Sequence, residues 1–144
     1  MKVNDDELRQ MMALMENYRA RIDALTRQVN LIRATIEEVN MANQSIRSII
    51  DANEGDEILM PIGASSFVHM KVSSDKNVIV DIGSGISTEK TPEEASKFME
   101  ANAAELTEAL KKSTSALQEV QQALQTVSEA VQIEYNNRQE TPMQ

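Results

Sequence analysis

Residues that could do chemistry are few in this chain, and none stands at the spacing of a catalytic or metal site. His69 is the only histidine and there is no cysteine, so no zinc ligand set and no activated nucleophile can be assembled. The GSG run at 83–85 lacks the Lys-Ser/Thr pair of a phosphate-binding loop. Asp75 and Asp81 lack the spacing of a calcium loop. We therefore predict no catalytic residue, no metal and no cofactor, and expect a protein that is not an enzyme.

Charge and hydropathy narrow the class of protein further. No apolar run reaches the roughly eighteen residues of a membrane-spanning helix, so we expect no membrane partner. The start, MKVNDDELRQ, is too acidic for a targeting peptide, which favours a cytoplasmic protein. A net charge of -9 argues against nucleic acid as a partner. With no Trp, two Phe and two Tyr, the chain has little aromatic material for a compact core.

The first long segment without glycine has the pattern of a coiled-coil helix. Apolar residues recur at alternating spacings of three and four from Leu8 to Ile50, and this ladder predicts a helix over 4–51. Only Asn43 in the ladder is polar. A lone polar residue in such a seam fixes the register at a cost in stability, so we expect Asn43→Leu to raise the melting temperature.

A second glycine-free segment begins with a strong helix start signal. Thr91 stands as N-cap, Pro92 at the first helical position and Glu94 at the third, which is the arrangement of a capping box. A second 3-4 ladder follows, from Met99 to Val131. We expect a coiled-coil helix over 92–135 and a flexible tail over 136–144.

The two helical arms have nearly equal length, which favours an antiparallel hairpin of helices within one domain, 1–144. Beside the second ladder, alanines recur every seven residues at 109, 116, 123 and 130. Small residues along a seam allow close approach of two helices, although alanine is also simply a good helix former.

The middle segment holds all four glycines and reads as short strands. β-Branched, partly alternating runs are separated by GASS, SSDK and GSG, which predicts two consecutive β-hairpins over 57–90. The expected strands are 57–62, 66–72, 77–82 and 85–90. Isolated hairpins are marginal in water and their edges pair readily. We therefore expect an oligomerisation module in which Val78, Val80 and Ile82 bury against another subunit. The fold class is α+β, mainly α: a two-helix coiled coil with two central hairpins.

This layout resembles the archaeal prefoldin α subunit. The resemblance covers about residues 5–138 and is carried by LMPIGASSFVHMKV at 59–72, VIVDIGSGI at 78–86 and TPEEA at 91–95, between two long helices. Two hairpins, where the β-type prefoldin subunits have one, place the chain in the α class.

The resemblance implies a hexamer of two α and four β-type subunits, whose strands form a body of β-barrels. It implies an ATP-independent co-chaperone whose arms hold unfolded client proteins and pass them to a group II chaperonin. The partners are then β-type subunits, a second α subunit, clients and the chaperonin. The assembly residues carried onto this chain are Ile58, Met60, Ile62, Phe67, Val68, Met70, Val72, Val78, Val80, Ile82 and Ile86.

The ends of the two arms are more apolar than their own pairing requires. The seam needs Leu8, Met11 and Met15. Met12 and Leu14 flank it, and the second ladder, which ends at Val131, places Ile133 away from it. Methionine is flexible and polarizable, which suits a surface that accepts many shapes. With the resemblance, this predicts a client-binding tip. Its residues are Leu8, Met11, Met12, Leu14, Met15, Val131, Ile133 and Tyr135. The alternative is that they only close the end of the coiled coil.

Two other functions fit the same pattern. One is a prefoldin-like structural protein that forms homo-oligomers or filaments through its hairpins. The other is a coiled-coil adaptor for one specific partner.

Overall fold

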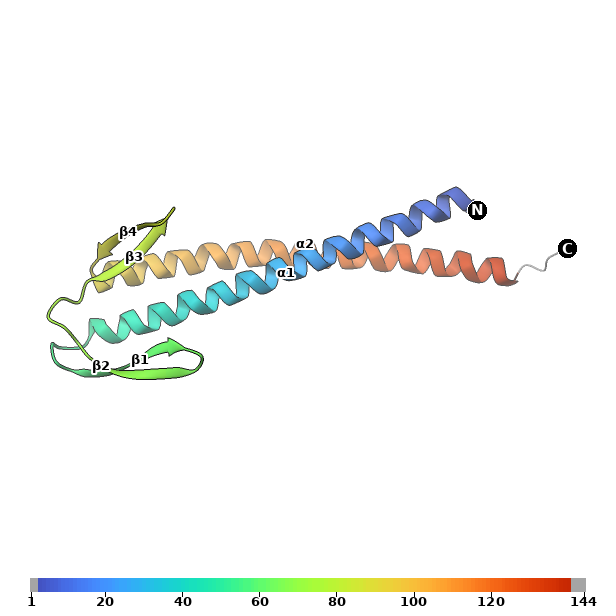
Figure 1. The fold of residues 1–144 in the computed structure, drawn as a ribbon. Coiled ribbons are helices and arrows are strands. Elements are labelled where there is room, and N and C mark those ends of the chain that lie inside the picture. The colour runs from blue at the N-terminus through green and yellow to red at the C-terminus, as the bar shows by residue number, and fades with distance from the viewer. Residues whose placement is uncertain (1–2, 141–144) are drawn as a thin grey trace. The chain divides into compact units, whose positions relative to one another are not determined.

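The protein has two long antiparallel helices that pack together, with two β-hairpins between them in the chain (Figure 1). The computed structural model describes residues 3–140. The elements are α1 (Asp5–Ile50), β1 (Glu57–Gly63), β2 (Ser66–Lys71), β3 (Val78–Gly83), β4 (Ile86–Lys90) and α2 (Pro92–Glu140). The predicted fold class, mainly α with two central hairpins, is confirmed.

Both helices begin at a capping box. The Glu94 amide donates to Thr91 Oγ1 at 3.2 Å, and the Thr91 amide donates to Glu94 Oε2 at 3.4 Å. The sequence NDDE does the same for α1, where the Glu7 amide donates to Asn4 Oδ1 at 2.8 Å. These reciprocal bonds satisfy amides that have no partner inside the helix.

Helix α2 ends at Glu140, five residues after the predicted end at 135. Residues 136–140 belong to the helix and not to a tail, while 141–144 lie outside the described residues. The extra turn is supported by Arg138, whose Nε donates to Glu134 Oε1 at 2.9 Å one turn earlier.

The chain divides into two compact units, each containing a piece of both helices. The first comprises the described parts of Met1–Ile32 and Ala109–Gln144, and the second is Arg33–Glu108. In both units every residue of the two predicted ladders is buried or half-buried. Full burial is rare, as expected where only two helices share a seam and solvent lies on either side.

In the second unit, β3 packs on the helices of its own chain. Ile46, Val80 and Ala95 form a buried cluster, and Val78 and Phe98 pack against it. Val80 is only 3 % exposed. Val80 therefore has almost no surface left for another subunit, which corrects the expectation for that residue. Val78 is only half-buried and Ile82 is exposed, so their burial against another subunit stays a prediction.

The polar residue of the first ladder has a partner that spacing alone did not reveal. Asn43 Oδ1 accepts a hydrogen bond of 2.7 Å from the hydroxyl of buried Ser96 on α2. Replacing Asn43 by Leu would leave that hydroxyl without this acceptor. The sign of the expected effect on the melting temperature is thus reversed.

The hairpins are two-stranded antiparallel sheets with similar turns. β1 pairs with β2 from Glu57 opposite Lys71, and β3 pairs with β4 from Val78 opposite Lys90. In the first turn Ala64 and Ser65 have φ of 51° and 58°. Positive φ at both central residues is the mark of a type I′ turn, whose twist suits a β-hairpin.

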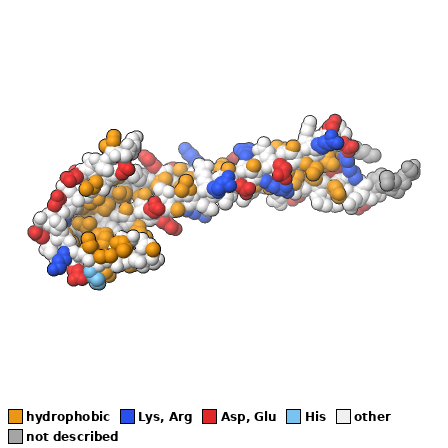
Figure 2. Space-filling model, viewed as in Figure 1, with side chains coloured by type: hydrophobic (Ala, Val, Ile, Leu, Met, Phe, Trp, Pro, Cys, Tyr) orange, Lys and Arg blue, Asp and Glu red, His pale blue; other side chains and the backbone are white. Residues whose placement is uncertain are grey.

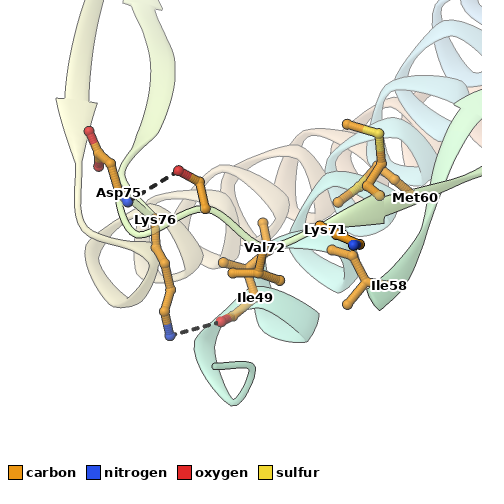
Figure 3. Close-up of a pocket in the computed structure, with 9 residues that line it drawn as sticks. Ile49, Ile58, Met60, Lys71, Val72, Asp75 and Lys76 are labelled. Atoms are coloured by element: carbon orange, nitrogen blue, oxygen red, sulfur yellow. Dashed lines mark hydrogen bonds between the residues drawn. The ribbon is translucent and has the colours of Figure 1, made fainter. Parts of the chain in front are cut away.

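The linker between the hairpins is fixed to the C-terminal end of α1. Lys76 Nζ donates to the carbonyl oxygen of Ile49 at 3.4 Å (Figure 3). It also donates to the carbonyl oxygen of Ala52 at 2.5 Å. A cation suits the carbonyl end of a helix, where the backbone oxygens lack partners. Lys76 therefore holds the segment before β3 against the helix.

Candidate functional site

At the tip, apolar side chains lie in two layers. We define the tip as residues 3–15 of α1 and 131–140 of α2, which belong to the same unit. An outer layer is exposed, with Met12 at 54 % and Ile133 at 61 %; its members are Met12, Leu14, Ile133 and Tyr135. An inner layer is half-buried in the seam; its members are Leu8, Met11, Met15 and Val131. Met12, Leu14 and Ile133 thus lie off the seam, where their spacing placed them.

One arginine joins the start of α1 to the last turns of α2 at the tip. Arg138 donates from one terminal nitrogen to Asp5 Oδ1 at 2.6 Å and from the other to the Val3 carbonyl oxygen at 2.9 Å. Hydrogen bonding and the charge of Arg138 lower the pKa of Asp5. Bonds to Glu134 and Asp5 raise the pKa of Arg138. Both groups are therefore charged at neutral pH.

Sequence reasoning missed this contact. The spacing of Glu134 and Arg138 does indicate a pair on one helix. Asp5, however, stands 133 positions from Arg138, and no local pattern links the two residues.

The hairpins carry a second group of exposed apolar side chains. Figure 2 shows hydrophobic side chains gathered on this part of the chain. The exposed members are Leu59, Ile62, Phe67, Val68, Met70, Ile79, Ile82 and Ile86. Ile79, at 72 % the most exposed of them, and Leu59 were not among the predicted assembly residues. Large apolar side chains exposed in such number on two short hairpins indicate an interaction surface.

The remaining predicted assembly residues face their own chain. Val72 and Val80 are buried, and Ile58, Met60 and Val78 are half-buried. Ile58 and Met60 line a hollow of about 200 Å³ between the end of α1 and the first hairpin (Figure 3). Pockets for small molecules usually exceed about 300 Å³. The hollow therefore suits packing of the hairpin on the helix more than a ligand.

The lone histidine lies on the open face of a hairpin. His69 Nδ1 is 2.7 Å from Glu57 Oε1, and both side chains are exposed. Within residues 3–140, no three His, Asp or Glu side chains gather closely enough to hold a metal ion. No helix in the same range is long and apolar enough to cross a membrane.

Comparison with known proteins agrees with this arrangement. The family model "Prefoldin subunit" matches residues 18–137. The chain is 36 % identical over 108 residues to prefoldin subunit alpha of Methanothrix thermoacetophila, covering 75 % of this chain and 71 % of the relative. It is 31 % identical over 110 residues to prefoldin subunit alpha of Nitrosopumilus maritimus, covering 76 % and 73 %.

A solved structure shares the fold. A chain of filamentous PFD from Methanocaldococcus jannaschii aligns with a TM-score of 0.63 at 26 % identity, covering 82 % of this chain and 98 % of that one. Two paired helices, two hairpins, a family match over most of the length and several alpha-subunit relatives lead to one assignment. The chain belongs to the prefoldin subunit family, in its alpha class, a family of chaperone subunits that are not enzymes.

Proposed function

We propose that this chain is an ATP-independent holding subunit that captures unfolded proteins at the apolar tip. In this proposal it assembles in the cytoplasm with a second α subunit and four β-type subunits, and passes clients to a group II chaperonin. Membership in the alpha class supports a chaperone role and assembly with β subunits in a hexamer. The capture site and the delivery step are proposals.

The observation that carries the capture site is the outer layer of the tip. Met12, Leu14 and Ile133 are exposed although other residues fill the seam. Burying one such side chain against a client contributes roughly 1.5–3 kcal/mol if burial is complete, and less at a helix end. One arm would hold a client weakly, and several arms on one body would hold it by avidity.

The test is a triple serine variant of the outer layer: Met12→Ser, Leu14→Ser and Ile133→Ser. Because these residues lie outside the seam, we expect helix content and assembly to stay intact. Suppression of client aggregation by the complete complex, without nucleotide, should weaken. The loss should be larger when the tips of the other subunits are also blunted, since avidity masks a single arm.

A matched control places three serines at exposed positions away from the tip: Glu37, Glu119 and Gln122. This variant should protect clients as well as the parent. Full protection by the tip variant, even with the other arms blunted, would mean that the apolar end only closes the coiled coil.

A second candidate function is a homo-oligomeric or filamentous structural role. It is favoured by one comparison, because the aligned solved chain comes from a filament. Mixing this chain with a β-type subunit separates the two functions. A discrete hexamer supports the holding role, whereas long filaments from this chain alone support the structural one. A plain adaptor would bind one partner and ignore a panel of unrelated unfolded proteins.

A further inference from the structure

We propose that Arg138 is a positioning residue that sets how much of the apolar tip a client can reach. The contacts that Arg138 makes with Val3, Asp5 and Glu134 are called the clamp below. This inference rests on the proposed client-holding function, and it concerns control of the site rather than its existence.

The clamp joins the start of α1 to the last turns of α2 through one side chain. Arg138 donates to Glu134 on its own helix at 2.9 Å, to Asp5 at 2.6 Å and to the Val3 carbonyl at 2.9 Å. A guanidinium presents its donors in a rigid fork, so it can bind several acceptors at once. The Glu134 carboxylate also holds the fork in place, since that side chain is only 12 % exposed.

The clamp lies at the end of the helix–helix seam in which the inner-layer side chains are half-buried. Leu8 and Met11 follow Asp5 by one and two turns on α1, and both are half-buried while the helices stay paired. Val131 belongs to the same end of α2 and is also half-buried. Separation of the first turns of α1 would add these residues to the exposed outer layer. A closed tip thus offers a client one layer, and an open tip offers both.

The clamp is weak enough to open. The side chains of Asp5 and Arg138 are 79 % and 39 % exposed. Ion pairs between exposed groups contribute little to stability and are screened by salt. Helix ends also open at low free energy, because they have few contacts to lose. Ionic strength should therefore shift the balance between closed and open tips.

The first experiment compares the native complete complex with one carrying Arg138→Gln. We expect several-fold faster amide hydrogen exchange in residues 5–15. Capture of an unfolded test protein should be stronger at low salt and should change less with added salt than in the native complex. Arg138→Lys should be intermediate, because an ammonium keeps the charge but lacks the fork.

The matched control is Arg19→Gln. Arg19 pairs at 2.8 Å with Glu16 on the same helix and is exposed, so this variant loses the same charge without unlinking the two helices. It should keep the native exchange rates and the native salt response.

A locked variant tests the opposite direction. Because the chain has no cysteine, Asp5→Cys with Arg138→Cys can be bridged by a short bismaleimide. Bridging should reduce capture below the unbridged level and leave the outer layer as the remaining contact surface. If Arg138→Gln leaves exchange unchanged, or speeds exchange without increasing capture, the proposal is overturned. Failure of the outer-layer serine variant to weaken capture would instead count against the client-holding function itself.

Discussion

At the residue scale, a single hydrogen bond decides how the polar seam position behaves. Asn43→Leu removes the acceptor of the buried Ser96 hydroxyl. An unsatisfied buried polar group costs about 1–3 kcal/mol. We therefore expect the variant to melt at a lower temperature than the parent, although leucine suits a coiled-coil seam better than asparagine.

The double variant Asn43→Leu with Ser96→Ala isolates this cause. It removes both partners and should recover much of the lost stability, since replacing a bonded pair by apolar groups is often nearly neutral. Thermal unfolding of the single and double variants provides the measurement. A melting temperature raised by Asn43→Leu alone would show that the bond contributes nothing.

Lys76 is the second residue whose role only the fold reveals. Lys76→Met keeps the length of the side chain but removes the cation bound to the carbonyls of Ile49 and Ala52. We expect the free energy of unfolding to fall by about 1 kcal/mol, the usual size of a partly exposed hydrogen bond of this type. Lys71→Met, at an exposed lysine of the same hollow, should change it much less. If urea unfolding showed equal losses of stability for the two variants, Lys76 would not act as a cap of α1.

The pH response of the tip follows from Asp5. Its pKa lies below the ordinary value of 3.8, because Arg138 bonds and attracts the ionised carboxylate. A lowered pKa in the folded chain means that the clamp contributes fully above the ordinary pKa and is lost as pH falls through the lowered one. An NMR titration of the first turn of α1 should show its contacts loosening at a pH below the ordinary pKa of an aspartate. Asp5→Asn should abolish that transition, and a transition that persists would belong to another group.

At the element scale, local sequence signals predict which helices and strands form, but not which other elements pack against them. The 3-4 ladders and the TPEEA capping box predict both helices, and turn residues predict both hairpins. Alternation along β3 shows that Val78 and Val80 share a face. It does not show that α1 and α2 of the same chain cover that face. The Asp5–Arg138 contact escapes prediction for a related reason, because it depends on the register of two helices joined by a long connection.

The first hairpin turn offers a test of backbone strain. Ala64 has φ of 51°, a region that costs a residue with a Cβ roughly 1–2 kcal/mol. Ala64→Gly should therefore raise the free energy of unfolding by up to about 1 kcal/mol, after the greater entropy of glycine in the unfolded chain. Ala13→Gly, at an exposed position in α1, should lower it by about 1 kcal/mol. Chemical unfolding of both variants measures these changes. A loss of stability in Ala64→Gly would show that the backbone at Ala64 is not strained.

At the scale of the whole molecule, the chain separates two kinds of apolar surface. The tip offers a few exposed side chains on helix ends, while the hairpins offer a broader set on strands that, within residues 3–140, are paired along one edge only. Strand edges suit permanent pairing with other subunits. Scattered methionine and leucine suit weak contact with many partners. A net charge of -9 limits unspecific association elsewhere on the surface.

This separation predicts that substitutions at the neighbouring positions Ile79 and Val80 have different effects, one on assembly and the other on folding. Ile79 and Phe67 are exposed in the single chain, so Ile79→Ser with Phe67→Ser should leave the fold intact and weaken assembly. Val80 lies in the buried cluster with Ile46 and Ala95. Val80→Asp would bury an unpaired carboxylate there, which costs several kcal/mol, so its first effect should be on folding.

Sedimentation should show smaller species for the serine variant at native helix content, and circular dichroism should show a lowered melting temperature for Val80→Asp. Lys71→Ser, at an exposed polar position on β2, should change neither. Normal assembly of the serine variant would mean that these two side chains face water in the complex, and that subunits join through another face of the hairpins.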